Sequence, residues 1–271
     1  MSRMRGRVLI VAGSDSGGGA GIQADIKSVT ALGGYAMTAI SALTSQDTTG
    51  VHGIHEVPPD FIRSQMRVVL SDLGADCIKT GMLHSKGVIE AVAEVLSELA
   101  PNVPLVADPV MVAKGGARLL APDTMATLKA RLIPLVTVLT PNLPEAEALT
   151  GLAIRDLDGM RKAAETLLRM GPKAVLVKGG HLPSDRVYDV LATSAGMTVL
   201  EHVRIESRST HGTGCTLASA IATGLAQGLE LRAAVTRARA YVLEAIRTAP
   251  GYGHGHGPLN HVHTVKPFDA A

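Results

Sequence analysis

The stretch His211-Gly-Thr-Gly-Cys-Thr216 runs directly into Leu217-Ala-Ser-Ala-Ile-Ala222, so two glycines open a predicted helix and the Cys215 thiol lies in its first turn. The first N–H groups of a helix have no partner inside it and lie at the positive end of the helix dipole. Such a turn holds a phosphate or a transferring phosphoryl group well, and Gly212 and Gly214 let a ligand approach the backbone closely. The alternative is a helix start that requires flexible residues, with Cys215 as a small core side chain.

The composition indicates a globular chain with a large core. At 271 residues, the chain is compatible with one α/β domain over residues 1–271. Hydrophobic residues make up 46% and charged residues 18%, but aromatic residues only 2%, so Ala, Val, Leu and Ile must pack the core. With a net charge of +2 and no Lys/Arg clusters, we expect no nucleic-acid partner.

The sequence also predicts the compartment. No apolar run approaches membrane-spanning length, so we expect no membrane partner. The run from Val8 to Ala12 is too short for a signal peptide. Cys77 and Cys215 form no paired motif that would indicate a disulfide framework. We therefore expect a cytoplasmic protein.

Short β-branched runs alternate with longer Ala/Leu-rich segments along the chain. The candidate strands are Arg7–Ala12, Tyr35–Leu43, Ala75–Lys79, Pro104–Ala107, Val136–Thr140 and Ala174–Lys178. The candidate helices are Gly21–Leu32, Pro59–Leu73, Lys86–Ala100, Pro122–Leu132, Leu157–Met170, Gly214–Gln227 and Leu231–Thr248. Val187–Leu191 and Met197–Arg204 flank a turn and predict a late hairpin. This alternation predicts an α/β fold with a mostly parallel central sheet and helices on both faces.

Polar or Gly-rich loops follow five of the predicted strands. In open α/β sheets, ligands bind outside the carboxyl ends of the strands, so these loops are expected to converge on one edge. The loops are Gly13–Gly21, Thr80–Leu83, Asp108–Lys114, Thr140–Glu145 and Lys178–His181.

The first loop, Gly13-Ser-Asp-Ser-Gly-Gly-Gly-Ala-Gly21, matches neither a dinucleotide fingerprint nor a phosphate-binding P-loop. A loop that wraps a small polar substrate fits better. Asp25 lies one helical turn further on, where its carboxylate could accept a hydrogen bond from a substrate amine or hydroxyl. The alternative is an N-terminal helix acid favoured by the dipole.

Four further side chains are candidates for binding. The Gln46 carboxamide carries an acceptor and donors side by side, which matches the edge of an aminopyrimidine, although a solvated turn residue is the alternative. Asn142 and Glu145 open a helix, where the carboxylate could hold Mg²⁺ through water or simply belong to a helix-entry sequence. Lys178 ends a strand and suits a nucleotide phosphate, or lies at the sheet edge with its charge in solvent.

Two more features have competing interpretations. Asp108, before Pro109, could add charge to the same Mg²⁺ ion or be a satisfied strand-end carboxylate. The histidines of the C-terminal segment could form a metal cluster, but a terminal segment that packs against the body of the protein is the preferred interpretation. These histidines are His254, His256, His261 and His263.

Taken together, these residues resemble the hydroxymethylpyrimidine/phosphomethylpyrimidine kinases of thiamine biosynthesis, within the ribokinase-like family. The likeness covers nearly the whole chain, and the order and spacing of its motifs carry it. The motifs are Val11–Asp25, Thr44-Ser-Gln-Asp-Thr-Thr-Gly-Val51, Lys79-Thr-Gly-Met-Leu83, Asp108-Pro-Val-Met111, Thr140-Pro-Asn-Leu-Pro-Glu-Ala-Glu147, Val177-Lys-Gly-Gly-His181, His211-Gly-Thr-Gly-Cys-Thr216 and Gly255-His-Gly-Pro258 with His261 and His263.

The resemblance implies a ribokinase-like three-layer fold, and ATP with Mg²⁺ as co-substrate and cofactor. It also implies roles for named residues. The pyrimidine pocket would consist of Gly13, Asp25, Gln46, Met82 and Val110. The ATP phosphates and Mg²⁺ would be arranged by Asp108, Asn142, Glu145 and Lys178. The anion hole would be Gly212, Thr213, Gly214 and Cys215, with Cys215 at the position of the catalytic base. A helix N-terminus lowers the pKa of a thiol, so Cys215 is expected to take the proton of the acceptor hydroxyl. Most ribokinase-like sugar kinases carry Asp there, which counts against a sugar substrate.

The activity implied is two successive phosphorylations of 4-amino-5-hydroxymethyl-2-methylpyrimidine, to the monophosphate and then the diphosphate. Two alternatives stay open: a pyridoxal or pyridoxine kinase of vitamin B6 salvage, and a non-catalytic pyrimidine-binding sensor on the same fold. Gln46 favours an aminopyrimidine, because pyridoxal lacks the exocyclic amine. Family likeness also implies a homodimer.

Overall fold

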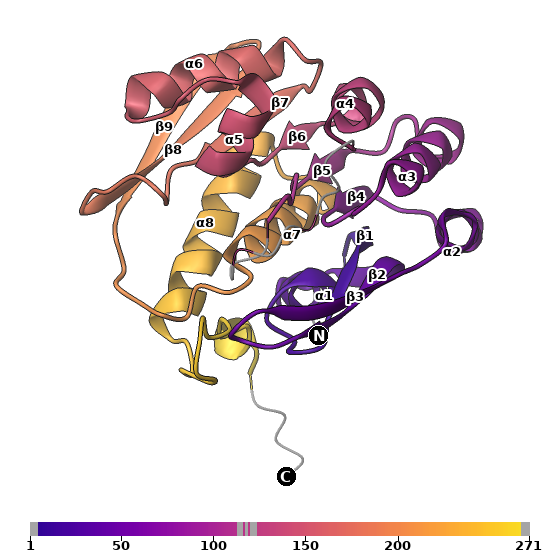
Figure 1. The fold of residues 1–271 in the computed structure, drawn as a ribbon, viewed down its shortest axis with the longest axis horizontal. Helices are drawn as coiled ribbons and strands as arrows, with labels where there is room; N and C mark the ends of the chain where they lie inside the picture. The colour runs from indigo at the N-terminus through magenta and orange to yellow at the C-terminus, as the bar shows by residue number, and fades with distance from the viewer. Residues whose placement is uncertain (1–4, 113–115, 117–118, 120–123, 267–271) are drawn as a thin grey trace.

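A computed structural model describes residues 5–112, 116, 119 and 124–266 of the chain. Within these residues a nine-stranded sheet has the order β3-β2-β1-β4-β5-β6-β7-β8-β9 (Figure 1). Its strands are β1 (Arg7–Asp15), β2 (Tyr35–Gln46), β3 (Val51–Glu56), β4 (Cys77–Thr80), β5 (Leu105–Ala107), β6 (Val138–Leu139), β7 (Ala174–Lys178), β8 (Arg186–Thr193) and β9 (Gly196–Val203). The central strands pair in parallel, and β3, β8 and β9 add antiparallel pairs at the two ends.

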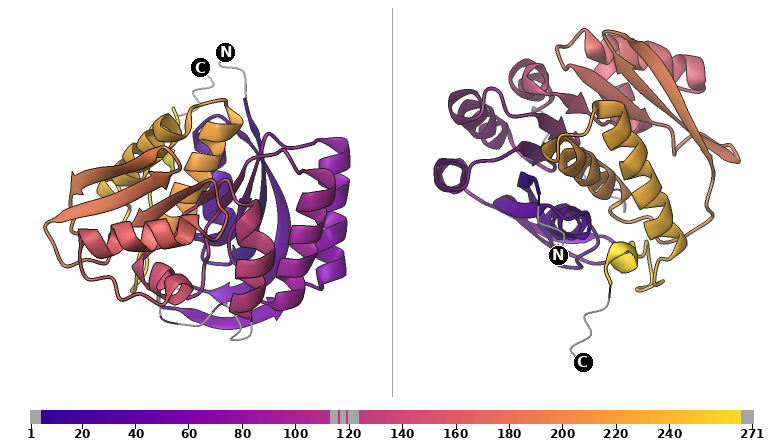
Figure 2. Two further views of the ribbon diagram at one scale, coloured as in Figure 1. Left: turned by 90° about the horizontal axis from the view of Figure 1, so that it is seen from above. Right: turned by 180° about the vertical axis from the view of Figure 1, so that it is seen from behind.

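Helices cover both faces of this sheet, as the sequence predicts (Figures 1 and 2). On β1, Leu9 and Val11 point into one core and Val8 and Ile10 into the other, the alternation expected of a strand buried on both sides. The first core packs against α2 (Pro59–Asp72), α3 (Lys86–Leu99), α5 (Leu143–Thr150) and α6 (Leu157–Leu168). The second packs against α1 (Gly21–Ala31), α7 (Thr213–Ala226) and α8 (Leu231–Arg247).

Most predicted elements are confirmed with ends shifted by one to three residues, but three differ. β3 was expected to be loop; it pairs antiparallel with β2 around the Asp47–Gly50 turn. α5 is a full helix of which the sequence indicated only the start. The first residues of the helix expected over Pro122–Leu132 lie outside the described residues. The described part is not one regular helix but α4 (Thr124–Thr127), a π-helical turn at Leu128–Leu132 and a 3-10 turn at Ile133–Leu135.

The C-terminal segment packs against the body of the protein, as expected. Its 3-10 turn, Val262–Thr264, follows His261, which is buried and lies with Nδ1 3.1 Å from the Tyr241 hydroxyl. Burial lowers the pKa of His261 to about 4, so the ring that shares this hydrogen bond with Tyr241 is neutral. No group of three or more His, Cys, Asp or Glu side chains in the described part of the chain is placed to hold a metal ion.

Residues 252–258 form a strap that joins two distant loops. The strap's His256 N–H donates to the Thr48 carbonyl, at 2.8 Å, and the Gly257 carbonyl accepts from the His211 N–H, at 3.1 Å. A side chain at Gly255 would lie 2.1 Å from the Thr48 carbonyl oxygen, so only glycine allows this approach. The strap therefore holds the turn after β2 beside the turn that starts α7.

Within the described residues, no helix has the length and apolar character that a membrane crossing requires.

Candidate active site

The five polar loops do converge, on a cavity of about 690 Å³ at the carboxyl edge of the sheet. This volume lies in the range of small-molecule sites. The cavity wall contains most of the residues singled out from the sequence. These are Gly13, Gln46, Met82, Val110, Asp108, Asn142, Glu145, Lys178, Gly212, Thr213, Gly214 and Cys215.

The start of α7 faces two of the other loops directly. Gly212 caps the helix with a φ of 79°, and a Cβ there would lie 1.8 Å from the Gly19 carbonyl oxygen. A Cβ on Gly214 would meet the Asp108 carboxylate at 3.1 Å and the Lys178 ammonium at 3.2 Å. Glycine at these positions thus brings the unpaired N–H groups of the helix start close to a charged pair from β5 and β7, the two strands on either side of β6.

That charged pair is Asp108, after β5, and Lys178, at the end of β7. Lys178 Nζ donates to Asp108 Oδ1 at 2.8 Å, and the Thr140 hydroxyl donates to the same oxygen at 3.2 Å. Burial acts to lower the pKa of Lys178, but the Asp108 and Glu145 carboxylates raise it by a larger amount. The pKa therefore lies above its usual value, and the ammonium stays charged. The pair is mostly buried and places one positive charge beside the α7 N-terminus.

Asn142 and Glu145 form a capping box at the start of α5. The Asn142 side chain accepts from the Glu145 N–H at 3.0 Å, and Glu145 Oε2 accepts from the Asn142 N–H at 2.8 Å. The helix-entry interpretation is therefore correct, and it places a buried carboxylate in the cavity wall. Burial raises the pKa of Glu145 to about 7, since the opposing effect of Lys178 is smaller.

Cys215 lies in the first turn of α7 and is partly exposed. A helix N-terminus was expected to lower the pKa of its thiol; instead, burial raises this pKa to about 12. The Lys79 ammonium and the Gly21 N–H oppose this effect but do not overcome it, and the Asp25 carboxylate adds to it. The prediction of a low thiol pKa is wrong because the surrounding protein desolvates the thiolate.

Asp25 lies beneath the cavity rather than on its wall. Its carboxylate is fully buried, accepts from Lys79 Nζ at 2.8 and 2.9 Å, and accepts from the Ser219 hydroxyl at 2.7 Å. The prediction that Asp25 accepts a hydrogen bond from the ligand is therefore not met in this structure, because Lys79 of β4 donates to both carboxylate oxygens. Lys79, which the sequence analysis did not single out, lines the cavity floor instead.

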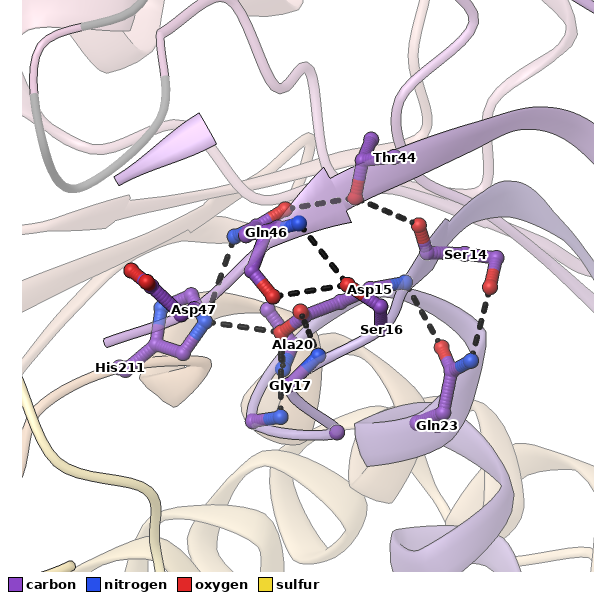
Figure 3. Close-up of polar contacts among 12 residues, drawn as sticks. Ser14, Asp15, Ser16, Gly17, Ala20, Gln23, Thr44, Gln46, Asp47 and His211 are labelled. Atoms are coloured by element: carbon purple, nitrogen blue, oxygen red, sulfur yellow. Dashed lines mark hydrogen bonds and ion pairs between the residues drawn. The ribbon is translucent and has the colours of Figure 1, made fainter. Parts of the chain in front are cut away.

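The loop after β1 is organised around Asp15, which the sequence did not identify as a site residue. Asp15 accepts from the N–H groups of Gly17, Gly19 and Ala20, and its Oδ2 lies 2.8 Å from His211 Nε2 (Figure 3). The amide nitrogen of Gln46 lies 3.3 Å from the same ring nitrogen. These contacts join the first loop, the turn after β2 and the start of α7.

The cavity extends away from these loops toward β8, β9 and α8. Its far end is lined by apolar side chains of β8 and α8 together with two basic residues; they are Val187, Val242, Leu243, Ile246, His202 and Arg204. Arg239 of α8 holds this end together, because its guanidinium donates to the Asp189 carboxylate at 2.8 Å and lies 2.8 Å from His202 Nδ1. No local sequence motif indicated that this region belongs to the site.

Comparison with known proteins identifies the family. The family described as Phosphomethylpyrimidine kinase matches residues 15–260, nearly the whole chain. The chain belongs to this family. Among its phosphomethylpyrimidine kinase relatives, the "Hydroxymethylpyrimidine/phosphomethylpyrimidine kinase" of Bacillus subtilis is 47% identical over 94% of this chain and 94% of its own length. The "Thiamine biosynthesis bifunctional protein ThiED" of Geobacter sulfurreducens is 54% identical over 95% of this chain, which spans about half (52%) of that protein.

Solved structures agree with this phosphomethylpyrimidine kinase assignment and with the ribokinase-like fold. The phosphomethylpyrimidine kinase of Clostridium difficile superposes with a TM-score of 0.79 at 41% identity, covering 89% of this chain and 99% of that one. The pyridoxal kinase of Staphylococcus aureus in complex with ADP superposes with a TM-score of 0.88 at 36% identity, covering 95% and 93%.

Proposed function

We propose that the protein uses ATP to phosphorylate 4-amino-5-hydroxymethyl-2-methylpyrimidine to its monophosphate and then to its diphosphate, in thiamine biosynthesis. One observation carries the proposal. The glycine-opened start of α7, with Cys215 in its first turn, faces the Asp108–Lys178 pair within one cavity. Donors and a fixed positive charge aimed at one point are what a loose phosphoryl-transfer transition state requires.

The acceptor pyrimidine binds at the end of the cavity formed by the first loop and β2. Gly13 and Met82 supply close, apolar contact, and Val110 covers the ring from the loop after β5. The Gln46 carboxamide pairs with the exocyclic amine and the adjacent ring nitrogen. Asp25 acts from below through Lys79 rather than by direct contact with the ring.

The nucleotide phosphates bind near Asp108, Asn142 and Lys178, and the apolar far end of the cavity suits a nucleotide base. The same wall fits Mg²⁺. Asp108 and Glu145 are two carboxylates in reach of one cavity, and a hard cation that keeps several waters needs no more protein ligands when phosphates complete its shell. Mg²⁺, when bound, neutralises phosphate charge. The neighbouring Asp108 carboxylate adds to the high pKa of Glu145, and a cation there would offset that repulsion.

The two phosphorylations place different demands on the chain. In the first, the hydroxyl oxygen attacks the γ-phosphorus, the bond to ADP breaks, and the hydroxyl proton passes to Cys215 in its thiolate form, which regenerates the thiol. In the second, the nucleophile is an anionic phosphate, which needs no base. In both, the N–H groups of Gly214 and Cys215 hold the transferring phosphoryl group and Lys178 stabilises its charge.

Pyridoxal kinase activity is the second candidate. It is favoured by the likeness to the Staphylococcus aureus pyridoxal kinase in complex with pyridoxal, at 36% identity and a TM-score of 0.87. The greater identity to proteins named as pyrimidine kinases, 47% for the Bacillus subtilis relative, ranks it below the main proposal.

We also infer that residues 1–271 work as one kinase domain in the cytoplasm, and as a homodimer. The cavity takes residues from β1 and from α8, so neither half of the chain contains a complete site. Phe61 and Val68 lie two turns apart on α2 with 61% and 62% of their surface exposed, an apolar stripe that a second copy would cover. Sedimentation of the purified protein tests the dimer.

A coupled ADP-release assay with ATP and Mg²⁺ tests the function. The acceptors are hydroxymethylpyrimidine, its monophosphate and pyridoxal at equal concentration. Turnover with both pyrimidines and little with pyridoxal supports the main proposal. Faster turnover with pyridoxal favours vitamin B6 salvage, and no turnover with any acceptor favours a pyrimidine-binding sensor.

A further inference from the structure

The Asp15 carboxylate determines that the Nε2 atom of His211 carries a hydrogen. Burial acts to raise the pKa of Asp15, but the His211 contact and the backbone amides of Ala20 and Gly17 lower it more, so the pKa lies below its usual value. Asp15 is therefore an ionised, acceptor-only group. Since Asp15 Oδ2 lies 2.8 Å from His211 Nε2, that nitrogen carries a hydrogen and donates it.

The groups on either side of the Gln46 side chain then determine which end of its amide is the oxygen and which is the nitrogen. The two ends of an amide exchange by a half-turn with almost no change of shape, so hydrogen-bond partners decide which end is oxygen. One end lies 3.3 Å from His211 Nε2 and the other 3.0 Å from Thr44 Oγ1 (Figure 3). His211 Nε2 is a donor, so an amide N–H on its side would oppose another N–H.

Thr44 completes the assignment. Its hydroxyl has one hydrogen, and the Ser14 carbonyl lies 2.8 Å away to accept it. The Thr44 oxygen is then free to accept from the Gln46 amide. The single hydrogen on His211 Nε2 points to Asp15, and a Gln46 carbonyl oxygen 3.3 Å away can share it, whereas an amide N–H at that place would have no acceptor. The Gln46 carbonyl therefore faces His211 and its NH₂ group faces Thr44. The backbone of Gln46 is also held, because its N–H donates to the Ser16 hydroxyl, which in turn donates to its carbonyl, both at 2.8 Å.

We infer that His211 is a positioning residue that fixes the orientation of the Gln46 amide, and that this orientation selects acceptor rings carrying an amino group beside a ring nitrogen. The inference rests on the proposed function, in which Gln46 contacts the acceptor ring. With one lone pair facing His211 and one N–H facing Thr44, the amide keeps one lone pair and one N–H for a ligand. Because the positions of this lone pair and this N–H are set, a ligand ring with its donor and acceptor exchanged would leave buried polar groups without partners. Leaving such groups unpaired costs binding free energy.

The same histidine connects the ring-binding end of the cavity to the phosphoryl-binding turn. His211 directly precedes Gly212, the cap of α7, and its N–H is held by the strap at Gly257. Gly19 leaves room for the imidazole, since a Cβ there would lie 2.3 Å from His211 Cδ2. One residue thus sets where the acceptor ring lies relative to the turn that holds the phosphoryl group.

The test compares two acceptors, hydroxymethylpyrimidine and its analogue without the 4-amino group. The readout is the ratio of their kcat/KM values. His211→Leu removes the donor and is expected to lower this ratio at least about tenfold, the discrimination that a lost polar contact supports. His211→Gln, which places an amide N–H near the position of Nε2, is the matched control and is expected to keep the ratio within about threefold.

Two further variants keep the outcomes separate. Thr44→Val removes the hydroxyl that accepts from the Gln46 amide and is also expected to lower the kcat/KM ratio of the two acceptors. This variant provides the test if the His211→Leu protein does not fold. An unchanged ratio in the folded His211→Leu protein, with Gln46→Leu lowering it, overturns the positioning role and leaves the proposed function intact. An unchanged ratio in Gln46→Leu refutes Gln46 as the ring reader, and with it this inference. Absence of turnover in the unaltered protein refutes the proposed function itself.

Discussion

Replacing Cys215 by Ala separates the two phosphorylations. The pKa of this thiol is about 12, so a preformed thiolate at pH 8 costs about 5 kcal/mol, at 1.36 kcal/mol for each of four pH units. Only about one molecule in 10⁴ carries it. The resting Cys215 is therefore a neutral thiol, and it accepts the hydroxyl proton only after its own proton has left to solvent, so the cost of forming the thiolate adds to the barrier of the first phosphorylation.

Loss of a general base lowers a rate by about 10²- to 10⁴-fold. We expect Cys215→Ala to lower kcat by such a factor for hydroxymethylpyrimidine. The monophosphate has a second pKa near 6 and is already ionised at pH 8, so its kcat is expected to change less than about threefold. The two rates are measured separately by ADP release with each acceptor.

The matched control is Thr216→Val, one residue further along α7. The Thr216 hydroxyl is buried and has no hydrogen-bond partner among the described residues, so its removal leaves the helix start unchanged. Both rates are expected to stay near those of the unaltered protein. Equal losses for the two acceptors in Cys215→Ala would refute the division of roles and assign the thiol to packing or to the anion hole alone.

Three other changes have expected outcomes. Gly214→Ala places a methyl group 3.1 Å from the Asp108 carboxylate and should raise the KM for ATP at least about tenfold with little change in Tm, because alanine favours the helix; an unchanged KM would contradict this. Glu145 has a folded pKa of about 7, above its usual 4.5, so its stabilising contribution is complete below pH 4.5 and is lost as pH rises through 7. Glu145→Gln should therefore remove part of the fall in unfolding free energy between pH 5 and 8, and identical pH slopes in urea titrations would argue against it. Lys79→Met leaves the Asp25 carboxylate buried without its counter-charge and should cost about 3–5 kcal/mol of unfolding free energy, much of it regained in the double variant with Asp25→Asn; no recovery in chemical denaturation would show that the ion pair is not the cause.

Elements were predicted well from the sequence where proline or glycine residues mark their ends locally. α2 begins at Pro59 and α7 begins within the glycine motif, and both were placed within one residue. β3 was missed because Val51-His-Gly-Ile-His-Glu56 is a mostly exposed edge strand with few apolar residues, and only pairing with β2 makes it a strand. The π-helical turn at Leu128–Leu132 has no sequence signature of its own.

The site was predictable where residues follow parallel strands. Asp108 and Lys178 were identified from such positions, since the carboxyl ends of these strands share an edge. Contacts between distant segments were not predictable. Asp15 and His211 are separated by 196 positions, and nothing in either local stretch indicates their hydrogen bond. Asp25 was placed in the right region. Its partner Lys79 was not predicted, because it lies within the buried strand β4 and not in a loop at the edge of the sheet.

The strap at residues 252–258 has a consequence for how the protein is made. The ribosome makes the β1 loop long before the strap, yet the strap holds the turn after β2 beside the start of α7. A growing chain has every described strand and all but the last 3-10 turn of its described helices before residue 252 is added. The link from the strap to the Thr48 carbonyl and the His211 N–H therefore forms only after the sheet and its covering helices have been made.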